Sequence, residues 1–159
     1  MSNLVVSNSN AGNEKQYIIF KLNEELYGID IMKINTIIMM PEITDVPLSP
    51  DYVEGMISLR GNVIPIINLH KRFNYGDDNI TNNSRIIVFN HTEDDQIGII
   101  VDSVNEVTVI ADENIELPSP FVKKEDSFIS GVGKQDENLI SILDVDLLVD
   151  EDILAEKIA

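Results

Sequence analysis

Two histidines are the first residues of this chain to consider for catalysis or metal binding, because imidazole serves both purposes. The 159-residue sequence holds only His70 and His91, and it holds no cysteine. An imidazole needs a partner base or further ligands within reach to do chemistry. The two histidines fall at non-equivalent positions, so we expect both to be exposed and no metal site to form between them. Without cysteine, neither disulfides nor thiolate metal sites can form.

The acidic residues form three short clusters, at 77–78, 93–95 and 150–152. None follows the pattern of a calcium loop, which has alternating ligands, a central glycine and a terminal glutamate. We interpret them as solvated turns or helix positions. The stretch Gly131-Val132-Gly133 lacks the lysine and the following helix of a phosphate loop and is interpreted as strand glycines. The sequence therefore predicts no catalytic constellation, no metal and no cofactor. An acid-based hydrolase stays open, because the proximity of two carboxylates cannot be read from sequence.

Arginine at position 60 is the polar residue with the clearest potential for recognition. It lies in the predicted hairpin turn Leu59-Arg60-Gly61-Asn62, where a Gly-Asn pair supplies the positive φ that tight turns often need. Gly61 thus has a backbone role, whereas Arg60 has none. The guanidinium group presents its donors in a fixed geometry that suits carboxylates at protein interfaces. Arg60 is therefore a candidate for partner binding, and a solvated hairpin arginine is the alternative.

The elements that position these residues come in two similar copies. Gly28-Ile29-Asp30-Ile31 recurs as Gly98-Ile99-Ile100-Val101, at a separation of 98 − 28 = 70 residues. The apolar run 63–69 recurs at 139–145, now at a separation of 139 − 63 = 76 residues. A repeat of this length indicates a duplicated small β unit. In the second copy the turn at 134–138 is acidic, so the scaffold does not require an arginine there.

Each copy predicts five short β segments with no long helix between them. Closure into a barrel removes the exposed edges that an open five-stranded sheet would leave, so the sequence predicts an all-β protein with two small barrels. Strand exchange between the barrels stays open. The predicted divisions are a flexible polar N-terminus at 1–15, a first barrel half at 16–73 with a helical turn at 69–73, a linker at 74–84, a second barrel half at 85–145 and an amphipathic C-terminal helix at 146–159.

Charge and hydropathy exclude several partner classes. The formal net charge is −17, from 28 acidic and 11 basic residues. Nucleic acids and anionic lipid surfaces both attract basic groups, so we expect neither to be a direct partner. Residues 1–15 lack the basic region of a signal peptide, and no stretch approaches the roughly 20 apolar residues of a membrane span. We expect a cytoplasmic protein.

Five motifs follow one another along the chain in a defined order. They are Tyr27-Gly28-Ile29-Asp30-Ile31, Gly55-Met56-Ile57-Ser58-Leu59-Arg60-Gly61, the run 63–69, Gly98-Ile99-Ile100-Val101-Asp102, and 129–133 leading into 139–148. This ordered set, which covers roughly residues 16–149, resembles in order and spacing the CheW family of bacterial chemotaxis coupling proteins. The resemblance implies two five-stranded SH3-like barrels without catalytic activity. It also implies an adaptor that connects the regulatory domain of the histidine kinase CheA to the cytoplasmic tip of chemoreceptors, with recruitment to receptor arrays.

The resemblance also implies which residues contact partners. They are Arg60, Gly61, Gly55, Ile34, Thr36, Ile86 and Val101. Thr36 stands where the family commonly has an acidic residue, so an ion pair between that position and Arg60 cannot form here. A CheW-like scaffold of a different chemosensory pathway, such as one controlling surface motility, is the close alternative. A regulatory domain excised from the kinase is less expected, because no kinase segment precedes residue 16.

Overall fold

The computed structural model describes residues 13–76, 80–117 and 128–148. Its strands are β1 (Glu14–Leu22), β2 (Glu25–Asp30), β3 (Ile34–Met39), β4 (Val53–Leu59), β5 (Asn62–Asn68), β6 (Arg85–Asn90), β7 (Gln96–Val101), β8 (Ser103–Ala111), β9 (Ile115–Glu116), β10 (Ile129–Gln135) and β11 (Asn138–Leu143). The helical turns are η2 (Ile31–Lys33), α2 (Leu69–Arg72), η3 (Asp112–Asn114) and η5 (Val145–Leu148). The helical turn predicted at 69–73 is confirmed as α2. Most of the predicted C-terminal helix, from residue 149 on, lies outside the described residues, as does most of the N-terminus.

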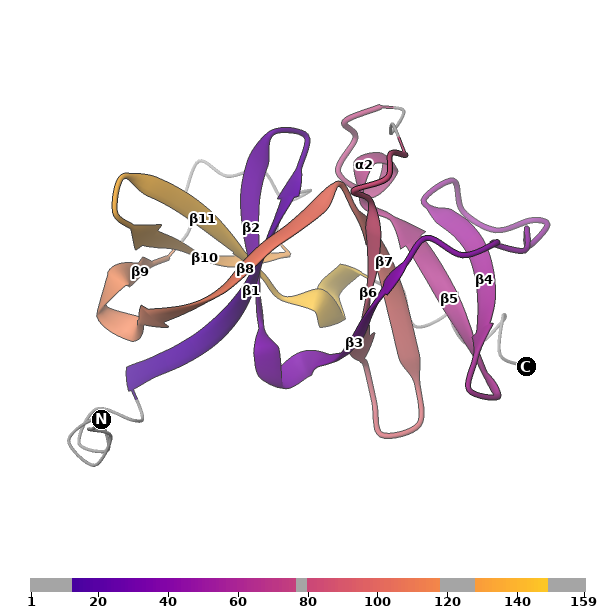
Figure 1. Cartoon of the computed structure of the whole chain (residues 1–159), viewed down its shortest axis with the longest axis horizontal. Coiled ribbons are helices and arrows are strands. Elements are labelled where there is room, and N and C mark those ends of the chain that lie inside the picture. The colour runs from indigo at the N-terminus through magenta and orange to yellow at the C-terminus, as the bar shows by residue number, and fades with distance from the viewer. Residues whose placement is uncertain (1–12, 77–79, 118–127, 149–159) are drawn as a thin grey trace.

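The strands form two sheets that lie side by side along the long axis of the molecule (Figure 1). One has six strands in the order β8-β1-β2-β11-β10-β9, and the other has five in the order β3-β6-β7-β5-β4. The prediction of an all-β protein with two small barrels is confirmed. The sixth strand, β9, has only two residues. We call the two units the six-stranded barrel and the five-stranded barrel.

Each sheet curls until its outer strands meet. In the five-stranded barrel the chain beyond β3 returns to β4, where Thr44 and Met56 exchange two backbone hydrogen bonds of 2.9 and 2.8 Å. In the six-stranded barrel Gln135 of β10 donates a side-chain hydrogen bond of 2.5 Å to Thr108 of β8. Gly133 of β10 also faces Ile110 of β8. Closure leaves few strand edges free to pair with other chains.

The two sheets do not follow the two sequence copies. The last hairpin of the first copy, β4–β5, joins the first hairpin of the second copy, β6–β7, through the parallel pair β5–β7. The last hairpin of the second copy, β10–β11, joins the first hairpin of the first copy, β1–β2, through the parallel pair β11–β2. The exchange is reciprocal, so segments 16–73 and 85–145 are repeat units in the sequence while each barrel contains strands from both.

Three apolar clusters hold the described residues together. The interior of the six-stranded barrel contains Tyr17, Ile19, Ile110, Ile140 and Ile142. The interior of the five-stranded barrel contains Ile57, Ile64, Ile66, Ile86, Val88 and Ile100. The largest cluster lies between the barrels and takes residues from both, including Phe20, Ile29, Phe89 and Ile99. Because burying one such side chain stabilises the fold by about 1.5–3 kcal/mol, most of the apolar stabilisation lies where the barrels meet.

The position of this central cluster explains the apolar runs in the first hairpin of each copy. In β1, Tyr17 and Ile19 point into the barrel while Ile18 and Phe20 point toward the other barrel. A strand buried on both faces has a continuous apolar sequence rather than an alternating one. The same holds for β6, with sequence RIIVFN.

Candidate functional site

The β4–β5 hairpin turns through two residues, Arg60 and Gly61, between the paired residues Leu59 and Asn62. Both turn residues have positive φ, 53° and 84°, as in a type I′ turn. Glycine adopts this conformation freely, whereas a left-handed backbone costs other residues about 1–2 kcal/mol. The turn type therefore accounts for Gly61 and disfavours Arg60.

The Arg60 side chain is exposed and forms no hydrogen bond or ion pair with any residue that the structure describes. Several other cations have intramolecular partners: Lys33 with Asp146, Lys71 with Glu54, and Arg72 with the carbonyl oxygen of Leu148. Arg72 also lies between the rings of Tyr52 and Phe128, at 4.8 and 5.1 Å from their centroids. An unpaired guanidinium at a hairpin tip remains available to a carboxylate of another molecule.

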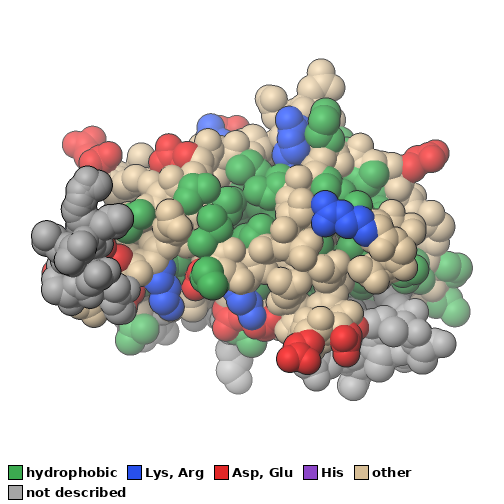
Figure 2. All heavy atoms as spheres, turned by 60° about the horizontal axis from the view of Figure 1, so that its bottom comes forward, with side chains coloured by type: hydrophobic (Ala, Val, Ile, Leu, Met, Phe, Trp, Pro, Cys, Tyr) green, Lys and Arg blue, Asp and Glu red, His purple; other side chains and the backbone are tan. Residues whose placement is uncertain are grey.

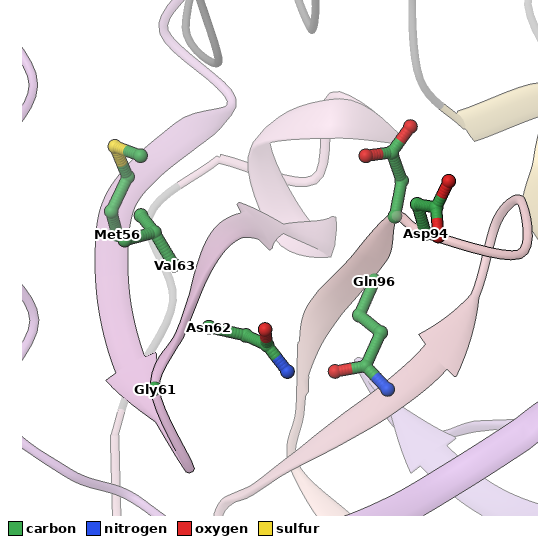
Figure 3. Close-up of a pocket in the computed structure, with 7 residues that line it drawn as sticks. Met56, Gly61, Asn62, Val63, Asp94 and Gln96 are labelled. Atoms are coloured by element: carbon green, nitrogen blue, oxygen red, sulfur yellow. The ribbon is translucent and has the colours of Figure 1, made fainter.

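A surface cavity of about 420 Å³ lies beside this turn. It is lined by Met56, Gly61, Asn62, Val63, Asp94, Asp95 and Gln96. Figure 3 shows Met56 and Val63 together on the hairpin and Gln96 facing Asn62 across the opening. The parallel pairing of β5 with β7 brings the starts of these two strands to the same edge. The cavity thus combines an apolar wall with the acidic β6–β7 turn, a combination that suits a side chain with an aliphatic stem and a basic end.

Topology also brings Ile34 and Thr36 to this end of the five-stranded sheet. Strands β3, β5 and β7 run in the same direction, because β3 and β7 are both antiparallel to β6 and β5 is parallel to β7. The start of β3 therefore lies at the same end as the β4–β5 and β6–β7 turns. Ile34 packs against the cluster between the barrels, and both residues are half-buried. Four of the seven expected contact residues thus lie at one end of the sheet.

The other three expected contact residues are buried. Ile86 and Val101 have no exposed surface, and they belong to the interior of the five-stranded barrel and to the cluster between the barrels, respectively. Gly55 is buried at a bulge of β4, with φ 156°, and a Cβ there would lie 2.2 Å from the carbonyl oxygen of Thr44. A partner that binds this surface reaches these three residues only through their neighbours.

The expectation that both histidines are exposed is wrong. The side chains of His70 and His91 are only 9% and 6% exposed. Each donates a ring N–H to a carboxylate: His70 to Asp102 at 2.8 Å and His91 to Asp146 at 3.2 Å. Sequence placed them correctly after β5 and in the β6–β7 turn, but their acceptors are 32 and 55 residues away. Only the tertiary structure brings each histidine next to its carboxylate.

Exposed aliphatic residues are a further signal, and the sequence analysis missed them. Val63 of β5 and Leu139 of β11, at equivalent repeat positions, are 59% and 61% exposed. Val107 and Val109 on the edge strand β8 are about half exposed. Figure 2 shows hydrophobic side chains in a band across the middle of one face, with acidic side chains toward its margins. Exposed apolar surface of this kind is typical of protein interaction sites.

Some classes of site receive no support from the described residues. The described ranges contain no group of three or more histidine, aspartate or glutamate side chains able to hold a metal ion. Residues 93–95 lie in the β6–β7 turn, as predicted, while clusters 77–78 and 150–152 lie outside the described residues. Among the described residues, no helix has the length and hydrophobicity that crossing a bilayer requires.

Known proteins similar to this chain share one family. A family model described as "CheW-like domain" matches residues 16–152. The chemotaxis protein CheW of Treponema pallidum is 35% identical over 141 residues, which cover 85% of this chain and 83% of that protein. CheW of Bacillus subtilis is 33% identical over 139 residues, covering 87% and 88%. The crystal structure of the scaffolding protein TtCheW from Thermoanaerobacter tengcongensis superimposes with a TM-score of 0.79 at 38% identity, covering 84% of this chain and 91% of that one.

Proposed function

The chain belongs to the CheW-like domain family, and on that premise we propose that it is a non-catalytic adaptor in bacterial chemotaxis signalling. It couples the cytoplasmic tip of chemoreceptors to the regulatory domain of the histidine kinase CheA, and it acts on the cytoplasmic side of the membrane. The similarity to chemotaxis CheW proteins and to a scaffolding protein, over more than four fifths of each chain, supports this assignment. A docking role also agrees with a surface that offers exposed aliphatic residues.

Arg60 is the residue that we assign to the receptor-facing surface, together with Gly61, Ile34 and Thr36. The observation that carries this assignment is an exposed arginine held in a left-handed turn, without a partner among the residues that the structure describes. Its backbone conformation disfavours it, so the folded scaffold gains nothing from an arginine there. Gly55, Ile86 and Val101 contribute from inside, by holding β4, β6 and β7 in place.

The unpaired state of Arg60 indicates what its partner supplies. Thr36 provides no carboxylate, and the acidic side chains of the β6–β7 turn form no ion pair with Arg60. A receptor or kinase segment that binds here therefore presents its own carboxylate to the guanidinium, in an arrangement that fixes orientation as well as affinity.

The test is a binding assay with the purified CheA regulatory domain and, separately, a receptor signalling fragment. We expect the wild-type chain to bind both. Arg60→Glu should lose receptor binding or receptor-dependent kinase activation while its thermal unfolding stays unchanged, because the turn contributes little to the core. The matched control is Lys134→Glu, which makes the same charge change at an exposed position of the β10–β11 hairpin that has no ion-pair partner among the described residues.

Each outcome separates one part of the proposal from the rest. Normal receptor coupling by Arg60→Glu contradicts the assignment of that residue, while the adaptor role stands. Binding to neither protein by the wild-type chain contradicts the adaptor role in this pathway. Binding to the kinase of another chemosensory system instead would support the scaffold of a different pathway.

A further inference from the structure

The two barrels are connected by two short links within the described residues. The chain passes from the six-stranded to the five-stranded barrel through η2, between β2 and β3, and returns through the single residue Asp102, between β7 and β8. Figure 1 shows these links at opposite ends of the contact between the barrels, the first at the bottom and the second at the top. Any change in the relative orientation of the barrels must bend both links.

The link at Asp102 is held from both sides. Its Oδ1 accepts a 2.8 Å hydrogen bond from Nε2 of His70, which follows β5 in the five-stranded barrel. Its Oδ2 accepts a 2.8 Å bond from the backbone N–H of Asn23, in the β1–β2 turn of the six-stranded barrel. Its own N–H donates to the carbonyl oxygen of Lys21 at 3.0 Å. One carboxylate thus fastens the link to both barrels.

The link at η2 is held in a similar way by Asp146, which follows β11 in the six-stranded barrel. Its Oδ2 lies 2.6 Å from Nζ of Lys33, the last residue of η2. Its Oδ1 accepts a 3.2 Å hydrogen bond from Nδ1 of His91, in the β6–β7 turn of the five-stranded barrel. The side chain of Asp30 also accepts from the N–H of Met32 at 2.9 Å and so stiffens the same link.

The two arrangements are related by the repeat. His70 and Asp146 are equivalent positions, since 146 − 70 = 76, the separation of the last hairpins. His70 follows the last hairpin of the first copy and binds Asp102, the link in the second copy. Asp146 follows the last hairpin of the second copy and binds Lys33, in the link of the first copy. Donor and acceptor are exchanged between the two links. At one link the imidazole of His70 donates to the carboxylate of Asp102, and at the other the carboxylate of Asp146 accepts from Lys33 and His91.

We propose that Asp102 and Asp146, with His70, His91 and Lys33, are positioning residues that fix the orientation of the two barrels. The apolar cluster between the barrels resists their separation but is non-directional, so it leaves sliding and rotation less restricted. Hydrogen bonds to charged groups require defined geometry and supply the missing restraint. A partner that contacts both barrels at once then meets a surface whose shape is fixed before the partner arrives.

The test measures the distance between the barrels directly, by pulsed electron spin resonance on the full chain. Because the sequence contains no cysteine, the substitutions Lys134→Cys and Glu42→Cys place one spin label on an exposed site of each barrel. In this labelled background we expect one narrow distance distribution. Replacing both His70 and Asp146 by alanine should broaden it or add a second population. Affinity for the receptor fragment should fall about tenfold for each restraint lost.

Three further variants separate positioning from general stability. His70→Gln keeps a donor near the Nε2 position and should restore the narrow distribution that His70→Ala loses. Lys33→Ala removes a half-buried ion pair whose loss is too small to unfold the chain, and it should broaden the distribution on its own. Lys71→Ala is the control, because its 3.9 Å ion pair with Glu54 joins α2 and β4 of one barrel. This control should leave the distance distribution unchanged.

An unchanged distance distribution in folded His70→Ala/Asp146→Ala and in Lys33→Ala would overturn the proposal. So would equal broadening in the Lys71→Ala control. The binding part of the test rests on the proposed function, whereas the distance part does not. If the wild-type chain fails to bind the receptor fragment, the proposed function fails while the distance measurement still decides whether these residues fix the barrels.

Discussion

The two last hairpins, β4–β5 and β10–β11, both turn through two residues of which the first is left-handed, but the two turns differ in charge. Arg60 and its equivalent Asp136 both have left-handed φ values, 53° and 55°. Val63 and Leu139, three residues further on, are both exposed to about the same extent. Aspartate tolerates the left-handed region because its short polar side chain hydrogen-bonds locally, whereas arginine has no such compensation. The comparison shows that the scaffold requires the turn but not the arginine, which points to a role of Arg60 outside the fold.

The bulges of the same hairpins differ in how tightly they are packed. Gly55 and Gly131 lie at equivalent register shifts. A Cβ at Gly55 would lie 2.2 Å from the backbone oxygen of Thr44, whereas a Cβ at Gly131 would lie 2.7 Å from a side-chain methyl of Ile115. A side chain moves more easily than a backbone segment that is held by two hydrogen bonds. The five-stranded barrel is therefore the less tolerant of the two.

The largest expected effect tests this difference. Gly55→Ala should reduce the free energy of unfolding by about 3 kcal/mol or more, through overpacking and a disfavoured φ, or prevent folding. Gly131→Ala should be tolerated better, because Ile115 can shift. Urea denaturation of both variants measures the difference, with Gly61→Ala as a reference where a Cβ meets no atom but φ is 84°. Equal losses in the free energy of unfolding for Gly55→Ala and Gly131→Ala would contradict the interpretation.

Substituting the first turn residue of each hairpin should have a smaller effect on stability. Arg60→Asn should stabilise the fold by about 0.5–1 kcal/mol, since asparagine is favoured in type I′ turns, while it abolishes receptor coupling. Asp136→Arg should destabilise by a similar amount without creating a second coupling site. Thermal unfolding and the receptor-binding assay measure the two properties separately. A destabilised Arg60→Asn variant would show that the arginine serves the fold after all.

The smallest expected effect concerns the barrel interiors. The five-stranded interior contains only aliphatic residues among those described, whereas the six-stranded interior contains Tyr17. Burial raises the pKa of Tyr17, with Asp30 and Asp112 contributing in the same direction. The folded state therefore holds this proton more tightly than the unfolded state, so stability is lost as pH rises above about 10. Tyr17→Phe should flatten this loss, measured as unfolding midpoints from pH 8 to 11. Ultraviolet titration of the Tyr17→Phe variant should show one fewer tyrosine with a raised pKa.

Local sequence signals predicted much of the fold and part of the site. Apolar stretches separated by polar turns predicted the hairpins, and the repeat predicted two equivalent units. The equivalence is seen again where the N–H of Asn68 donates to the carbonyl oxygen of Tyr52 and that of Asp144 donates to the carbonyl oxygen of Phe128. The predicted hairpin turn at Arg60 and Gly61 is confirmed, because a turn is a local structure, while the role of these residues in partner binding stays a prediction. The histidines were placed wrongly with respect to solvent, because burial depends on segments far away in the chain.

By itself, the sequence determined which residues form strands, where the chain turns and to which family it belongs, because these properties depend on neighbours in the chain and on motif order. Only the tertiary structure decided that the hairpins are exchanged between the copies, that the largest apolar cluster lies between the barrels and that carboxylates hold both links. The physical reason is that two similar hairpins have the same apolar pattern. Either can pair with either partner, and only the packing of the complete chain selects one arrangement.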